Sequence, residues 1–283
     1  MTLAEASVHS AGAWPFTTFR SYMQRGRPII WRARHHRKGL ARTDRALEAT
    51  PPPVWHTKAY NWWNGLAFLI GAALFILGSA LSLIPGAAET FTQSGINSLF
   101  FAGSIPFTIA GYMQHFQAAN AGGFDAGAAA RTRVSLIGWH PASPGWLSTF
   151  CQFVGTVAFN FNTFDALVPP QGVGAQNLAI WLPGMIGSVL FLISAYLAFV
   201  ETAHAYWTWR ASDLAWWIVF INLLGCVFFL AASILYWVPR GPEPAWVLPV
   251  ANGALGLGAL GFFAGAALMM REARAEGVNP KQD

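Results

Sequence analysis

Residues 60–85 read YNWWNGLAFLIGAALFILGSALSLIP, and this uncharged stretch decides the fold class. An α-helix needs about 20 mostly apolar residues to cross the hydrocarbon core of a bilayer. Five further segments meet the same criterion. The six predicted spans are 60–84, 94–117, 146–168, 178–203, 214–238 and 246–270. Period-two alternation, which would indicate the strands of a membrane β-barrel, is absent. The sequence therefore predicts an all-α polytopic membrane protein.

The composition points the same way. The chain has 283 residues, of which 54% are hydrophobic and 10% are charged, whereas soluble domains carry about 25% charged residues. So little polar surface cannot cover a water-soluble core, which excludes soluble enzymes, disordered chains and coiled coils. Cys151 and Cys226 both lie within predicted spans, so no disulfide framework is expected.

The positive charges predict the orientation of the spans. Sixteen of the seventeen Lys and Arg residues fall in the two tails and the loops on one side, and Arg240 alone falls on the other. Such asymmetry places both termini in the cytoplasm. The expected organisation is a basic cytoplasmic tail over 1–59, a transmembrane domain over 60–270 and a short cytoplasmic tail over 271–283.

The first, third and fifth spans share one motif. The pattern W-x8-G-x3-F-x3-[ST]-x5-P begins at Trp62, Trp146 and Trp216 without a gap. The tryptophan lies on the helix face opposite the glycine, where we expect it to join the aromatic belt at the membrane interface. The proline is expected to end each helix at the outer boundary.

The second, fourth and sixth spans share a related motif. In them G-x3-F-x3-small begins at Gly103, Gly187 and Gly258. Small residues on one helix face allow close approach between helices in lipid. The chain is therefore predicted to be three tandem two-helix hairpins, packed as a six-helix bundle with a pseudo-three-fold axis along the membrane normal. The hairpins are 60–117, 146–203 and 214–270.

The first hairpin resembles the YrhK-type domain, a small bacterial two-helix membrane module. The residues that carry the resemblance are Gly78–Ser79 and Gly103–Ser104–Ile105. Gly187–Ser188 repeats the second signature, whereas the third hairpin departs from it with Gly258–Ala259. The resemblance implies a bacterial inner (plasma) membrane protein. It implies no activity.

Polar residues inside the spans are the candidates for a ligand or ion pathway, because such groups are costly in lipid and often functional. Asp165 takes a position where the other two repeats have leucine, although a carboxylate so near a helix end also reaches lipid headgroups. Gln152 and Asn222 share one repeat position that faces the bundle interior. Asn160 and Asn162 complete the set. Hydrogen bonding between helices is the structural alternative for these amides.

The basic tail is expected to meet anionic lipid headgroups, which attract juxtamembrane Lys and Arg. Its candidate contacts are Arg32, Arg34, Arg37 and Lys38. Nucleic acid is the alternative partner for such a segment. The position beside a membrane favours lipid, and no nucleic-acid partner is predicted.

No catalytic motif, metal site or cofactor site is evident, so no catalytic residue is assigned. A haem held by His115 and His204 is a further alternative, although these histidines occupy different repeat positions. The prediction is a non-enzymatic membrane scaffold, or a binder of lipid or of a small apolar ligand. The alternative is a transporter of a small molecule or ion along the pseudo-three-fold axis. The oligomeric state stays open.

Overall fold

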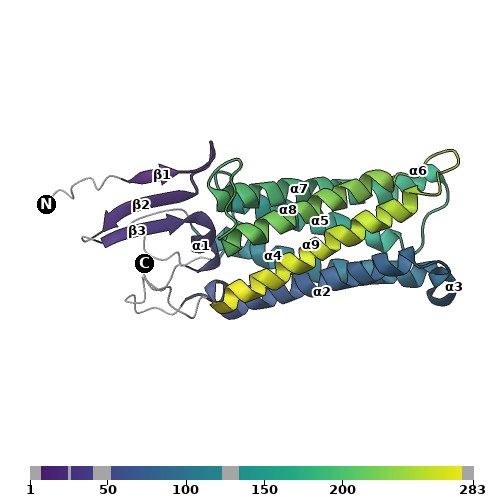
Figure 1. Ribbon diagram of the computed structural model, residues 1–283, viewed down its shortest axis with the longest axis horizontal. Coiled ribbons are helices and arrows are strands. Elements are labelled where there is room, and N and C mark those ends of the chain that lie inside the picture. The colour runs from purple at the N-terminus through teal and green to yellow at the C-terminus, as the bar shows by residue number, and fades with distance from the viewer. Residues whose placement is uncertain (1–7, 25–26, 41–51, 123–133, 276–283) are drawn as a thin grey trace.

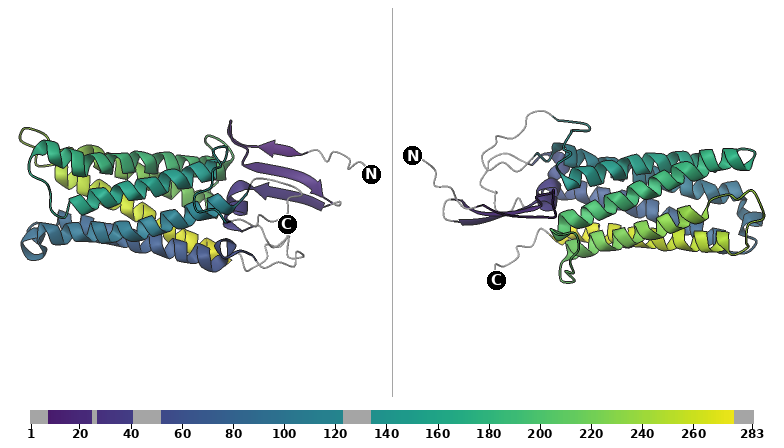
Figure 2. Two further views of the ribbon diagram at one scale, coloured as in Figure 1. Left: turned by 180° about the vertical axis from the view of Figure 1, so that it is seen from behind. Right: turned by 90° about the horizontal axis from the view of Figure 1, so that it is seen from above.

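Six long helices form a bundle, and a small sheet lies beyond one end of it (Figures 1 and 2). The computed structural model describes residues 8–24, 27–40, 52–122 and 134–275. The long helices are α2 (Lys58–Leu83), α4 (Gln93–Asn120), α5 (Pro144–Asp165), α7 (Leu182–Ala203), α8 (Leu214–Leu235) and α9 (Val247–Ala275). The short helices α3 (Ala87–Phe91) and α6 (Val173–Gln176) lie at the other end, where a π-helical turn over Asn177–Trp181 leads into α7.

The long helices close into a ring. Helix α2 packs against α4, α5 against α7, and α8 against α9, which are the partners within each predicted hairpin. Between hairpins, α4 packs against α5, α7 against α8, and α9 against α2. The first and last long helices are thus neighbours, and every long helix turns one face toward a common centre.

Glycines set the close approach of the two helices in each hairpin. A methyl group on Gly71 would lie 2.8 Å from the carbonyl oxygen of Gly103 and 2.8 Å from a ring carbon of Phe107. The equivalent glycines meet in the same way, Gly155 with Gly187 and Gly225 with Gly258. Only a residue without a side chain lets these backbones come so close.

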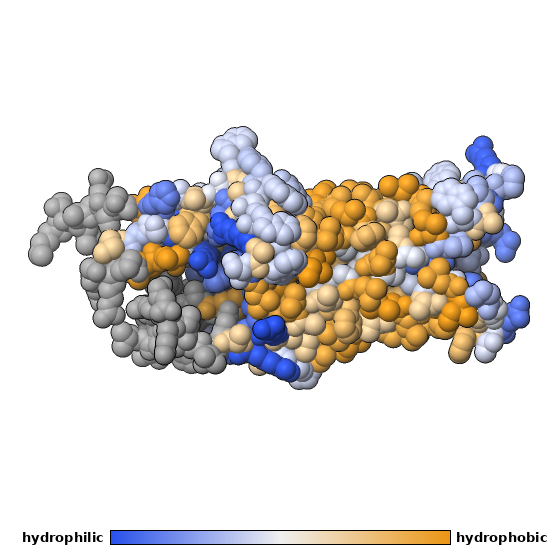
Figure 3. Space-filling view, viewed as in Figure 1, coloured by the Kyte–Doolittle hydropathy of each residue, from blue (hydrophilic) through white to orange (hydrophobic). Residues whose placement is uncertain are grey.

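Five helices are long and apolar enough to cross a membrane: α2, α4, α8, α9 and the helical stretch from Val173 to Ala203 that contains α7. On the face seen in Figure 3, a broad hydrophobic band covers the bundle between two more polar ends. Helix α5 occupies the predicted third span but is not among the five. It carries Gln152, Asn160 and Asn162, which lower its hydropathy.

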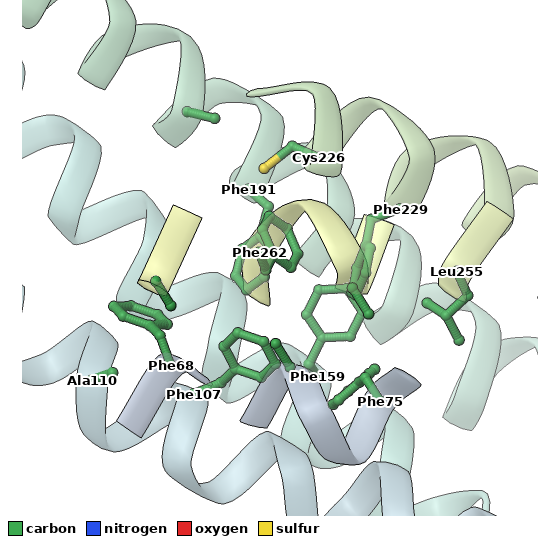
Figure 4. Close-up of a cluster of buried hydrophobic side chains, with 14 of the residues drawn as sticks. Phe68, Phe75, Phe107, Ala110, Phe159, Phe191, Cys226, Phe229, Leu255 and Phe262 are labelled. Carbon is green, nitrogen blue, oxygen red and sulfur yellow. The ribbon is translucent and has the colours of Figure 1, made fainter. Parts of the chain in front are cut away.

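Six phenylalanines fill the middle of the bundle, and we call them the phenylalanine plug (Figure 4). They are Phe75, Phe107, Phe159, Phe191, Phe229 and Phe262. Each hairpin contributes one pair, with ring centroids 5.5, 5.0 and 4.8 Å apart. Across hairpins, Phe229 lies 5.8 Å from both Phe75 and Phe159. Phe262 lies 5.9 Å from Phe107 and 6.0 Å from Phe191. The three hairpins therefore meet at one aromatic cluster.

The segment predicted as a basic tail contains a sheet and a helix. Strands β1 (His9–Ala11), β2 (Phe19–Gln24) and β3 (Arg27–Arg32) form an antiparallel sheet in the order β1-β2-β3. Helix α1 (Ala33–Lys38) follows β3 directly and ends at Gly39, whose φ of 71° is left-handed. This connection sets α1 against the end of the bundle (Figure 1).

The tryptophans of the repeated motif do not form the predicted interfacial belt. Trp146 and Trp216 are fully buried, and Trp62 is half-buried. The indole N–H of Trp146 donates to the carbonyl oxygen of Ile137 at 3.1 Å, and that of Trp216 donates to Thr208 at 2.9 Å. The loops before α5 and α8 fold over these rings, which a helical periodicity alone does not reveal.

Candidate functional site

A cavity lies at the centre of the ring, between the phenylalanine plug and α1, and we call it the axial cavity. Its volume is about 70 Å³, which is more than a single water needs. All six long helices and α1 line it. Phe107, Phe191 and Phe262 form its floor. Arg34, Arg37 and Lys38, the cation cluster, come from α1 at its other end.

Two carboxylates hold the cation cluster in place. Arg34 binds Glu272 of α9 through two parallel contacts, with Nη1 2.6 Å from Oε1 and Nη2 2.9 Å from Oε2. The Lys38 ammonium donates to Oε2 of Glu272 at 2.9 Å. Arg37 Nη2 donates to Oε2 of Glu201, in α7, at 2.7 Å. All five side chains are buried, so this is a buried ion-pair network.

The charges of the network are not evenly distributed around the cavity. Three cations face two carboxylates, which leaves one net positive charge in the network. Arg34, Arg37 and Lys38 line the axial cavity, whereas Glu201 and Glu272 do not. The cavity therefore meets the positive side of the network.

Amides and hydroxyls line the wall between the two ends. Gln152 and Asn222, which the sequence predicts to face the bundle interior, both line the axial cavity. Neither side chain makes a hydrogen bond to the residues that the structure describes. Gln114 also lines it and donates to Asn64 Oδ1 at 3.2 Å. The hydroxyls are those of Ser148, Thr149 and Ser194.

The other three predicted pathway residues lie away from this cavity. Asn160 Nδ2 donates to Thr108 Oγ1 at 2.9 Å, and Asn162 Nδ2 donates to the carbonyl oxygen of Ile180 at 2.7 Å. Both are therefore hydrogen bonds that join α5 to its neighbours. Asp165 is half-buried at the last residue of α5, about 20 Å along the helix from Gln152. The structure separates Asp165 from the polar groups of the cavity.

Of the four residues assigned to lipid headgroups, only Arg32 is exposed. Arg34, Arg37 and Lys38 are buried in the ion pairs with Glu201 and Glu272 instead. The expectation of exposed headgroup contacts is corrected for these three residues. Their carboxylate partners lie more than 160 residues away in the sequence, and a juxtamembrane charge count cannot anticipate such pairing.

Burial shifts the pKa values of the groups on α1. Desolvation, helped by the neighbouring Arg34 charge, lowers the pKa of Lys38 to about 8, although Glu272 opposes this shift. Desolvation and the charges of Arg34 and Arg32 lower the pKa of His35 to about 4. His35 is therefore neutral at pH 7.

His35 and His204 predict an acid-sensitive attachment of the N-terminal segment. His204 Nδ1 lies 2.9 Å from Thr18 Oγ1, and desolvation followed by the Arg210 charge lowers the pKa of His204 to about 4. In the unfolded chain both residues titrate at 6.5. Between pH 6.5 and about 4 the unfolded chain binds more protons, so the free energy of unfolding falls as the pH falls.

Thermal unfolding at pH 7, 6 and 5 checks this prediction. The apparent Tm of the native chain should decrease across the series, and that of a His35→Gln/His204→Gln variant should decrease less. Parallel curves for the two proteins would assign the acid sensitivity to other groups.

The two histidines of the haem alternative do not share a site. His115 is fully buried among aromatic rings, with its ring stacked on Phe153. His204 lies at the end of α7 against Thr18 and Phe19. Neither lines the axial cavity. Among the residues that the structure describes, no three His, Cys, Asp or Glu side chains gather in a group that could hold a metal ion.

Sequence reasoning missed the carboxylates that hold the cation cluster, although a signal was present. Glu201 and Glu272 stand fourteen residues after Gly187 and Gly258, and Gln117 stands fourteen after Gly103. All three side chains are buried. Burying a polar side chain without a hydrogen-bond or ion-pair partner costs free energy. A polar residue at the same position of every predicted hairpin therefore indicates that another segment, which supplies the partners, packs on this end of the bundle.

Comparison with known proteins identifies no similar protein. No protein-family model, no curated protein and no solved structure matches the chain. The functional argument therefore rests on the geometry of the axial cavity.

Proposed function

We propose that this chain is a six-span integral membrane protein that binds a small ligand in the axial cavity and catalyses no reaction. In this proposal three tandem hairpins form the bundle, and α5 is the sixth span despite its polar residues. Both termini lie in the cytoplasm, as the distribution of Lys and Arg supports. The likeness of the first hairpin to the YrhK-type module supports a bacterial inner membrane.

The observation that carries the proposal is the composition of the cavity. Six helices from three hairpins line one space that combines apolar side chains with cations, amides and hydroxyls. The side-chain amides of Gln152 and Asn222 are half-buried and line the cavity. Side-chain amides inside a protein normally find hydrogen-bond partners, and these two have none among the described residues. A bound ligand or water would supply the missing partners. The cations and amides favour a polar ligand over the apolar ligand that the sequence favours.

Transport along the axis is the second candidate. The axial cavity would form the part of such a path between α1 and the phenylalanine plug. The phenylalanine plug closes the axis on the other side of the cavity, with ring centroids of adjacent members 4.8–6.0 Å apart. This arrangement favours a binding site over an open path. Asp165, the sequence-based marker for transport, lies at the far end of α5.

Native mass spectrometry of the full-length protein in a mild detergent tests the proposal. We expect a retained non-lipid mass on the native chain. Ala198 lines the cavity, so Ala198→Phe should fill it and abolish that mass. Ala80→Phe is the matched control, because Ala80 is exposed on the outer face of α2. A native chain without such a mass, or an Ala198→Phe variant that keeps it, would contradict ligand binding in the axial cavity.

A further inference from the structure

We infer that the axial cavity binds a small anion, either a carboxylate or an inorganic oxyanion of three or four heavy atoms. This inference rests on the proposed function and specifies the chemistry of its ligand. It follows from three features of the described residues: the cations that line the cavity, the amides opposite them, and the size of the space.

The charge pattern selects the sign of the ligand. Arg34, Arg37 and Lys38 line the cavity, and the carboxylates that pair with them do not. Asp213 is a further acidic group near this end, but it caps α8 by accepting from the backbone N–H of Ala215 and does not line the cavity. A cation in the cavity would face three like charges. An anion there would be attracted by all three.

The wall supplies donors for such an anion. The side-chain amides of Gln152, on α5, and Asn222, on α8, stand at equivalent repeat positions and make no hydrogen bond within the described chain. Each has an NH₂ group with two donors. Hydrogen bonds to an ionised acceptor are about twice as strong as those between neutral groups. The cavity thus combines unused donors with a positive end.

The size of the cavity limits the ligand. A volume of about 70 Å³ is well above what a single water needs, and it admits an anion of the size of formate, acetate or nitrate. Residues from all six helices and α1 line this space, and neighbouring helices contact each other all round the ring. The site therefore lies on the bundle axis and not on the lipid-facing surface, which favours a free anion over a headgroup joined to acyl chains. The ligand is therefore a free anion.

Isothermal titration of the full-length protein in a mild detergent tests the inference. The probes are sodium formate, sodium acetate and sodium nitrate, with ionic strength held constant by sodium gluconate, whose anion is much larger than the three probes. We expect saturable binding of at least one small anion. Removing one donor with Gln152→Leu should weaken it at least about tenfold, the typical effect of a lost hydrogen bond to a charged group.

Matched variants, a neutral probe and a cationic probe make the result decisive. Asn162→Leu removes an amide on the same helix that lies outside the cavity, and it should leave the affinity unchanged. Anion binding that is equal in the native chain and in Gln152→Leu would overturn the inference, as would no binding at all. Acetamide or methylammonium binding that depends on Gln152, without anion binding, would overturn the anion inference and leave the proposed ligand site intact. Failure of the proposed function itself is read separately, from the mass spectra of the native chain.

Discussion

We expect Glu272→Leu to lower the free energy of unfolding by about 3–5 kcal/mol, the effect of removing one partner from a buried ion pair. Glu272 is 7% exposed and is the carboxylate partner of two cations, Arg34 and Lys38. Its loss leaves both positive charges buried without a counter-charge. The variant should therefore also release α1 from the end of the bundle and open the axial cavity on that side.

Thermal unfolding in detergent and limited proteolysis of the N-terminal segment measure the two effects. Glu89→Gln is the control, because Glu89 is exposed on α3 at the opposite end. Combining Glu272→Leu with Arg34→Leu and Lys38→Met should restore much of the lost stability, since buried ion pairs are often replaceable by apolar groups. If Glu272→Leu and Glu89→Gln unfold alike, the ion-pair network does not hold α1.

Phe229→Ala is expected to destabilise the protein by about 3–5 kcal/mol, as large core truncations do. Phe229 is 1% exposed, and its ring contacts Phe75, Phe159 and Phe262 at centroid distances of 4.8–5.8 Å. It therefore links all three hairpins within the phenylalanine plug. Removing this ring leaves a void that neighbouring helices cannot close without moving.

The adjacent residue provides a matched control. Phe228 is 39% exposed on the outer face of α8, so Phe228→Ala removes the same atoms from the lipid-facing side and should cost far less. Chemical denaturation of the two variants in mixed micelles compares them. Equal losses of stability would show that the plug does not hold the hairpins together.

The sequence predicted long apolar helices because a membrane span needs about 20 apolar residues. Helices α2 and α9 begin within two residues of their predicted starts, although α9 continues five residues past its predicted end. Close helix approach needs small side chains, and the contact of Gly71 with Gly103 follows the alignment. Both rules depend only on local sequence.

The burial of the cation cluster on α1 could not be predicted in the same way. The contact between Arg34 and Glu272 joins residues 238 positions apart, in α1 and α9. The net positive charge of this segment is equally consistent with binding to a lipid surface and with ion pairs inside the protein. Burial of charges depends on partners contributed by distant helices, and one segment does not contain that information.

The polar residues within α5 also have surroundings that the sequence alone does not reveal. Asn160 and Gln152 are alike as amides inside a predicted span, yet Asn160 bonds to Thr108 and Gln152 lines the cavity. Which amide is satisfied by a neighbouring helix depends on how the helices are rotated against each other. The alignment of repeats gave the correct face for Gln152 and Asn222, and Asp165 has no equivalent to guide its placement.

The membrane topology of α5 tests the central claim most directly, because the axial cavity needs all six helices to surround it. Alkaline phosphatase is active only outside the cytoplasm, and fusions after Gly86, Gly172 and Gly241 place it after each outward-going helix. The account predicts activity at all three positions and none after Asp283. An inactive fusion at Gly172 would show that α5 does not cross the membrane, which would contradict the six-span bundle and the cavity at its centre.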